Sequence, residues 1–174
     1  MRSNHNHAVY VALGSNLGDR EANIKKALAL LIETPHLNIR RISSFIENPA
    51  VGGPDDSPDF LNAAVELTTT LSPHALMKRL LEIEREMGRT RDKKWEPRPI
   101  DLDLLLFGDQ IISDDTLIVP HPLMHERRFV LEPLVEIAPR ANHPVLQVSA
   151  QTMLENLLAA EKRRIREERQ ESTN

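Results

Sequence analysis

Two aspartates, Asp101 and Asp103, lie at the start of the most strand-like apolar run in the chain, residues 100–107. Side chains two positions apart on a strand share a face, with Cα atoms roughly 6.8 Å apart. The leucines that alternate with the acids are expected to pack on the opposite face and fix the strand's register: Leu102, Leu104 and Leu106. Adjacent carboxylates repel unless a cation lies beside them, and Mg²⁺ prefers such oxygen ligands. The pattern predicts a magnesium site; the alternative is an exposed strand end with two solvated acids.

A basic segment precedes the two acids. Within ten residues it holds five cationic side chains: Arg89, Arg91, Lys93, Lys94 and Arg98. Alone, such a charge run is usually a solvated turn, but beside a metal site the arginines match phosphate oxygens. Metal-binding acids next to phosphate-binding bases are the components of phosphoryl transfer. The chain has no G-x-x-x-x-G-K-[ST] motif, so a P-loop enzyme is excluded.

Aromatic residues make up only 3% of the chain, yet Phe60, Trp95 and Phe129 all lie in polar segments. Each could anchor its own loop on the core, but together they favour stacking against a planar ring. Asn62 shares a strand face with Phe60 and offers both a donor and an acceptor to the edge of such a ring. His121, in Val-Pro-His-Pro, is either a catalytic candidate or a structural loop residue.

The elements that must position these residues alternate in type. These elements are predicted from the apolar patterning, from Asp19 and Ser72 as helix caps, and from Gly88 as a C′ residue. In order they are a strand at 8–13, a helix at 19–32, strands at 37–47 and 61–71, a helix at 72–87 and a strand at 100–107. This βαββαβ order indicates an α+β sandwich with helices on one face of an antiparallel sheet. A short helix at 127–137 and a longer one at 149–169 should follow, the second docked by Met153, Leu154, Leu157 and Leu158.

Composition narrows the class of protein. The 174 residues are 40% hydrophobic and 28% charged, with a net charge of −4 and no cysteine. Disulfides and thiolate metal sites are excluded, and no apolar run reaches the roughly 20 residues needed to span a bilayer. We expect a cytoplasmic monomer that binds neither membrane nor nucleic acid, with a disordered N-terminus at 1–7, a single domain at 8–160 and a charged tail at 161–174.

Taken together, these stretches resemble the 6-hydroxymethyl-7,8-dihydropterin pyrophosphokinase family. The matching segments, in order, are 12–17 (ALGSNL), 43–45 (SSF), 48–49 (NP), 58–64 (PDFLNAA), 88–89 (GR), 95–98 (WEPR), 101–104 (DLDL), 119–121 (VPH) and 127–129 (RRF). The Trp-x-Pro-Arg-x-x-Asp-x-Asp run is highly specific, so the match does not depend on one short motif.

The resemblance implies a ferredoxin-like fold and transfer of pyrophosphate from ATP to the hydroxymethyl group of the pterin, in folate biosynthesis. It places the pterin between Phe60 and Phe129, with further contacts from Asn48, Pro49, Val51, Asn62 and Trp95. It implies that Asp101 and Asp103 bind two magnesium ions and that Arg89 and Arg98 are catalytic. The ATP subsite it implies comprises Glu84, Arg91, Trp95, Arg98, His121 and Arg127.

The chain departs from the family's pattern at Glu96, Thr116, Ile118 and Pro122, so we expect the ATP contacts of 116–122 to differ. Two other functions fit parts of the pattern. A D-x-D nucleotidyl- or glycosyltransferase would share the metals but not the stacked pterin. A non-catalytic ferredoxin-like ligand-binding module would leave the acids solvated.

Overall fold

The computed structural model describes residues 7–48, 59–88 and 99–173. The first part of the chain forms β1 (His7–Ser15), α1 (Arg20–Ile32), β2 (Leu37–Ile42), β3 (Ile46–Asn48), β4 (Phe60–Thr69), α2 (Pro73–Glu86) and β5 (Asp101–Phe107). The second part forms β6 (Ile112–Ser113), β7 (Ile118–Val119), the 3₁₀ turn η1 (Met124–Glu126), α3 (Arg128–Ile137), β8 (Asn142–His143), β9 (Val148–Ser149) and α4 (Ala150–Glu171).

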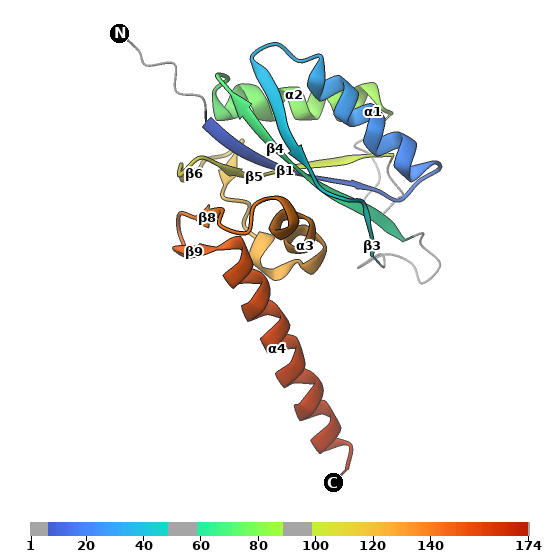
Figure 1. Ribbon diagram of the computed structural model, residues 1–174, viewed down its shortest axis with the longest axis vertical. Helices are drawn as coiled ribbons and strands as arrows, with labels where there is room; N and C mark the ends of the chain where they lie inside the picture. Colours follow the sequence, from blue (N-terminus) through green and yellow to red (C-terminus); the bar gives the residue numbers. More distant parts are fainter. Residues whose placement is uncertain (1–6, 49–58, 89–98, 174) are drawn as a thin grey trace.

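The main sheet is antiparallel, with strand order β2-β4-β1-β5, and β3 also pairs with β4 (Figure 1). The first strand therefore lies in the interior of the sheet, between β4 and β5. This order, together with the βαββαβ succession, confirms the predicted ferredoxin-like sandwich.

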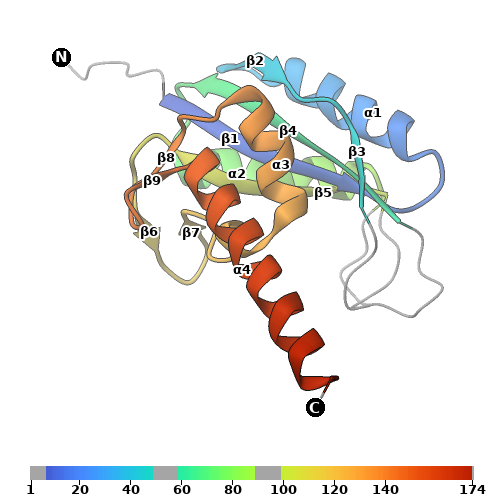
Figure 2. The ribbon, with the colours of Figure 1, turned by 60° about the horizontal axis from the view of Figure 1, so that its bottom comes forward.

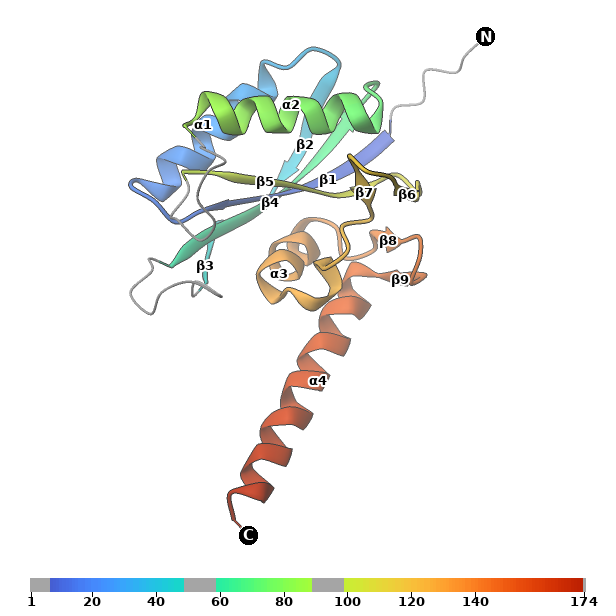
Figure 3. The same cartoon turned by 180° about the vertical axis from the view of Figure 1, so that it is seen from behind.

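Helices cover both faces of the sheet. Helices α1 and α2 lie on one face, and α3 lies on the other (Figures 1 and 3). Each face has its own apolar cluster, the first built with Ile24 and Leu80 and the second with Val130 and Leu134. The sequence placed helices on one face only, because it gave no sign of where the later helix packs.

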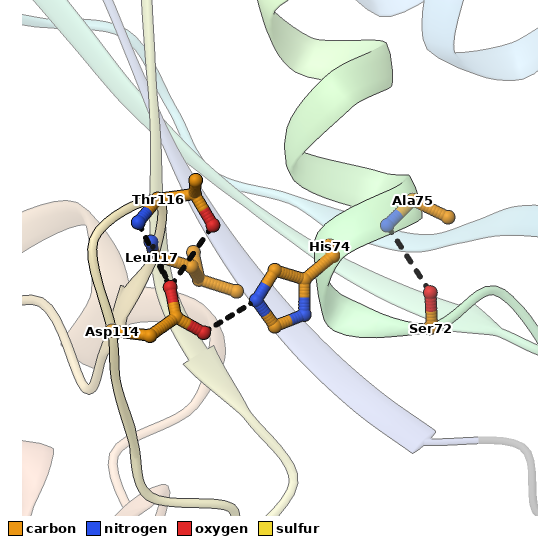
Figure 4. A network of polar contacts seen from close by, with 6 residues as sticks. All are labelled: Ser72, His74, Ala75, Asp114, Thr116 and Leu117. Atoms are coloured by element: carbon orange, nitrogen blue, oxygen red, sulfur yellow. Dashed lines mark hydrogen bonds and ion pairs between the residues drawn. The ribbon is translucent and has the colours of Figure 1, made fainter.

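The two helices of the sandwich begin at the predicted residues. Asp19 caps α1 by accepting a 3.0 Å hydrogen bond from the Ala22 N–H. Ser72 caps α2 in the same way, with a 3.2 Å bond from Ala75 (Figure 4). Capping satisfies N–H groups that have no partner inside the helix, so these boundaries follow from local chemistry.

The strand predicted at 37–47 is wrong as a single element. The structure breaks it into β2 and β3, with Ser43 and Ser44 between them. The Ser43 hydroxyl accepts a hydrogen bond from the Ala64 N–H, and the Ser43 N–H donates to the Ala64 carbonyl. Ser44 donates its N–H and its hydroxyl to Glu136 of α3, at 2.8 and 2.6 Å. These tertiary bonds bend the chain and tie α3 to the sheet.

Helix α4 extends away from the sandwich (Figures 1 and 2). Met153 is buried in the second apolar cluster, and Leu154 and Leu157 pack against it. The helix continues through residue 161, the predicted start of the charged tail, and side chains 162–173 are exposed. Within the described ranges, no helix is long and apolar enough to cross a bilayer.

Candidate active site

The Asp101 and Asp103 side chains lie on one face of β5, as predicted. Asp101 pairs with Gly14 of β1 and Asp103 pairs with Ala12. Leu102 lies between them and packs into the cluster on the opposite face, where it is 2% exposed. Both aspartates are half-buried, and their side chains lie on the α3 side of the sheet.

The prediction that Leu106 packs with Leu102 and Leu104 is wrong. The pairing of β1 with β5 shifts by one residue between Tyr10 and Val11, which leaves Leu105 as the extra residue of a β-bulge. Beyond the bulge Leu106 therefore faces the second apolar cluster, whereas Leu102 and Leu104 belong to the first. The bulge follows the two aspartates and does not alter their shared face.

Three of the residues predicted to bind the planar substrate lie on β3 and β4, which β1 separates from the strand of the aspartates. Asn62 of β4 pairs with Gly14, which in turn pairs with Asp101, so these residues form one row across three strands. Asn62 is 7% exposed and its Oδ1 accepts a 3.1 Å hydrogen bond from Asn48 Nδ2. Phe60 pairs with Asn48 and is half-buried. With strands about 4.8 Å apart, this group is about 10 Å from the acid pair.

Arg127 and Phe129 come from the junction of η1 and α3, which packs on the same face of the sheet. The Arg127 carbonyl accepts hydrogen bonds from the N–H groups of Val130 and Leu131 and so starts α3. The Arg127 guanidinium carbon lies 5.8 Å from the centroid of the Phe129 ring. Both side chains are half-buried, which leaves part of each surface open.

His121 is held close to the acids by the bulge in β5. Its N–H donates a 2.9 Å hydrogen bond to the Leu105 carbonyl, and its Nδ1 accepts one of 3.2 Å from the Leu123 N–H. Burial lowers the pKa of His121, the negative charge of Asp103 opposes that shift, and Arg127 adds to it. His121 is thus within electrostatic reach of both Asp103 and Arg127.

Glu84 of α2 is 2% exposed, and its Oε1 accepts a 2.8 Å hydrogen bond from the Leu102 N–H. Leu102 separates Asp101 from Asp103, so the carboxylate of Glu84 contacts the backbone that carries both acids. The sequence assigned Glu84 to the ATP subsite through the family resemblance alone and contained no sign of this backbone contact.

A second polar network, which the sequence did not reveal, joins α2 to the turn between β6 and β7 (Figure 4). Asp114 Oδ2 lies 2.8 Å from His74 Nε2, and Asp114 Oδ1 accepts from the Thr116 N–H, the Thr116 hydroxyl and the Leu117 N–H at 2.8–2.9 Å. These bonds, led by that from the Thr116 N–H and then that from His74, hold the pKa of Asp114 well below its usual range. The network fixes the turn that leads to His121.

Six of the predicted site residues lie outside the described residues: Pro49, Val51, Arg89, Arg91, Trp95 and Arg98. Their predicted roles stay predictions. Among residues 7–48, 59–88 and 99–173, no cluster of three or more His, Asp or Glu side chains could hold a metal ion.

Comparison with known proteins connects this chain to one family. The family model described as 7,8-dihydro-6-hydroxymethylpterin-pyrophosphokinase matches residues 10–139. The chain is 48% identical over 132 residues to a 2-amino-4-hydroxy-6-hydroxymethyldihydropteridine pyrophosphokinase of Bacillus subtilis, covering 76% of this chain and 78% of the relative. It is 43% identical over 130 residues to the protein of the same name from Methylorubrum extorquens, covering 75% and 82%.

Solved structures show the same fold. The structure of wild-type Plasmodium falciparum HPPK-DHPS with pteroate superposes with a TM-score of 0.72 at 14% identity, over 93% of this chain. The match covers 46% of that protein, so the chain spans about half the length of this structural neighbour. At this identity the likeness concerns the fold alone.

Proposed function

The chain belongs to the 7,8-dihydro-6-hydroxymethylpterin-pyrophosphokinase family, and from this premise we propose how its residues carry out the family's reaction. The reaction transfers pyrophosphate from ATP to the hydroxymethyl group of 6-hydroxymethyl-7,8-dihydropterin, giving AMP and the pterin diphosphate, a step of folate biosynthesis. ATP and the pterin are its small-molecule substrates.

The observation that carries the proposal is the row Asn62, Gly14 and Asp101 across β4, β1 and β5. It puts an amide suited to the edge of a heterocycle on the same sheet face as the acid pair. A bound pterin beside Asn62 would extend its hydroxymethyl group toward Asp101 and Asp103. ATP phosphates held at the two acids would then lie next to this hydroxymethyl group.

Asp101 and Asp103 are the proposed ligands of two Mg²⁺ ions. Their chemistry fits: the two half-buried carboxylates share one sheet face, and Mg²⁺ commonly takes one or two carboxylates with water and substrate phosphates. When bound, the ions would neutralise and orient the phosphates of ATP.

The remaining roles fall to side chains around this centre. Phe60 and Phe129 would stack on the pterin ring, and Asn62 with Asn48 would bind its edge. His121 and Arg127 would contact ATP from the α3 side. From the sequence alone we add Pro49, Val51 and Trp95 for the pterin, Arg91, Trp95 and Arg98 for ATP, and Arg89 and Arg98 for the transferred group.

The hydroxymethyl oxygen attacks the β-phosphorus of ATP in line, a new P–O bond forms, and the bond from the β-phosphorus to the bridging oxygen of AMP breaks. The leaving AMP takes the electron pair, and the hydroxymethyl proton is lost to solvent. Because such transition states are loose and rich in charge, positioning and charge neutralisation supply most of the acceleration. We further propose that the enzyme is a cytoplasmic monomer.

The test is AMP formation from ATP by the purified full chain, with and without the pterin alcohol and with Mg²⁺ or excess chelator. The proposal expects AMP in equal amounts with the pterin diphosphate, and only when both pterin and Mg²⁺ are present. Release of free pyrophosphate with an adenylylated product would instead indicate a nucleotidyltransferase. Pterin binding that is the same with and without Mg²⁺ and an ATP analogue, with no AMP, would indicate a ligand-binding module.

A further inference from the structure

Gly14 lies where the two halves of the site meet. It is buried, it is the last residue but one of β1, and it pairs with Asn62 on one side and with Asp101 on the other. Directly paired residues of antiparallel strands place their side chains on the same face. A side chain at position 14 would therefore stand between the amide of Asn62 and the carboxylate of Asp101.

The backbone does not demand glycine at this position. Positive φ angles occur at Gly18, Gly88 and Gly108, at 64°, 92° and 55°, whereas Gly14 has ordinary strand geometry. A glycine inside a strand is less stable than alanine by about 0.5–1 kcal/mol. The reason for glycine must therefore be the space around it.

That space is occupied by the substrate-facing side chains of β4. A Cβ atom added to Gly14 would lie 3.0 Å from Asn62 Nδ2, and 3.5 and 3.9 Å from Cδ1 and Cε1 of the Phe60 ring. The first distance is shorter than ordinary van der Waals contact, so Asn62 would have to move. Asn62 Oδ1 also accepts the hydrogen bond from Asn48, and a displaced amide would disturb the geometry of that bond.

We propose that Gly14 is a positioning residue for the pterin. By lacking a side chain it lets the Asn62 amide and the Phe60 ring lie across β1 in the orientation that binds the ring, next to the acid pair. A methyl group at position 14 would shift this pair by a few tenths of an ångström. The inference rests on the proposed assignment of Asn62 and Phe60 to the pterin.

The test compares steady-state AMP formation by the wild-type chain, Gly14→Ala and Gly18→Ala, together with their melting temperatures. Gly18→Ala is the control, because it strains a positive φ but adds a methyl with no atom within 4 Å. Gly14→Ala should raise the KM for the pterin roughly tenfold, with the KM for ATP within about twofold of wild type. Gly18→Ala should lower the melting temperature and leave both KM values unchanged.

An unchanged pterin KM in folded Gly14→Ala, or an equal rise in both KM values, would overturn the positioning role. If Gly14→Ala does not fold, Gly14→Ala with Asn62→Ser should recover the melting temperature of Asn62→Ser alone, because the atom nearest to the new methyl is gone. Failure to recover would overturn the proposal. A wild-type chain with no pterin-dependent AMP formation would instead refute the proposed function itself.

Discussion

Glu84 Oε1 accepts a 2.8 Å hydrogen bond from the N–H of Leu102, the residue between the two proposed magnesium ligands. β5 is the edge strand of the main sheet, so its outward backbone groups need partners other than a strand. Glu84 supplies one of them from α2, where it is almost fully buried. This contact holds the backbone that aims Asp101 and Asp103.

Glu84→Ala should therefore lower both stability and activity. It leaves the buried Leu102 N–H without its acceptor, a loss of about 1–3 kcal/mol, and we expect kcat/KM for ATP to fall at least roughly tenfold. Glu84→Gln keeps a side-chain oxygen for Leu102 and should retain more of both. Chemical denaturation and AMP formation measure the two effects. Wild-type stability and kcat/KM in Glu84→Ala would show that the contact has no positioning role.

The role of Asp114 in holding the turn before His121 can be tested with two variants at neighbouring positions. Asp114→Ala removes the acceptor of Thr116 and Leu117 and the partner of His74, so the turn before His121 should loosen. We expect a melting temperature lower by a few degrees and an ATP KM raised about threefold. Asp115→Ala, an exposed aspartate one residue later, is the control and should change neither. Equal effects of the two variants would contradict the prediction.

Glu136 should make the attachment of α3 to the sheet sensitive to acid. Hydrogen bonds from the Ser44 hydroxyl and then from its N–H lower the pKa of Glu136 from the ordinary 4.5. A depressed carboxylate pKa adds stability above about pH 4.5, which is lost as the pH falls through the folded-state value. Because the group is exposed, Glu136→Gln should lose less than about 1 kcal/mol at neutral pH.

Denaturation of the wild type and Glu136→Gln from about pH 7 to pH 3 checks this. The difference between their free energies of unfolding should shrink below about pH 4.5. The exposed control variant, Glu167→Gln, should show no such trend relative to the wild type. A difference that stays constant over the whole range would rule out Glu136 as the titrating group.

His143 should also make the protein less stable as the pH falls, in this case through a buried imidazole rather than a carboxylate. It is 5% exposed, and its Nδ1 accepts hydrogen bonds from the N–H groups of Val145 and Leu146 at 3.3 and 3.1 Å. Burial and then the nearby His125 lower its pKa from 6.5. The neutral form therefore favours the fold, and this stability is lost as the pH falls below about 6.5.

His143→Asn keeps an acceptor near the same place and does not titrate. Between about pH 7.5 and pH 5, its melting temperature should fall less than that of the wild type. Parallel decreases in the two proteins would mean that folding does not lower the pKa of His143.

What the sequence predicted well depends on neighbours along the chain. Asp19 and Ser72 cap helices through bonds to residues three positions away, and the shared face of Asp101 and Asp103 follows from strand periodicity. Leu106 was misplaced because the bulge depends on pairing with β1. The contact of Asp114 with His74 and that of Ser44 with Glu136 span 40 and 92 residues. No local pattern encodes such bonds, and the crowding at Gly14 likewise appears only when β4 lies beside β1.

Asp101 and Asp103 are the proposed magnesium-binding centre of pyrophosphate transfer. The most direct test is single-turnover AMP formation by the wild type, Asp101→Asn and Asp103→Asn over a range of Mg²⁺ concentrations. Loss of a charge-neutralising ion removes several kcal/mol of transition-state stabilisation, so each variant should be slower by at least roughly a hundredfold, with an unchanged melting temperature. A rate within about twofold of wild type for either variant, at the same Mg²⁺ concentration, would contradict the assignment of these two aspartates to the magnesium site.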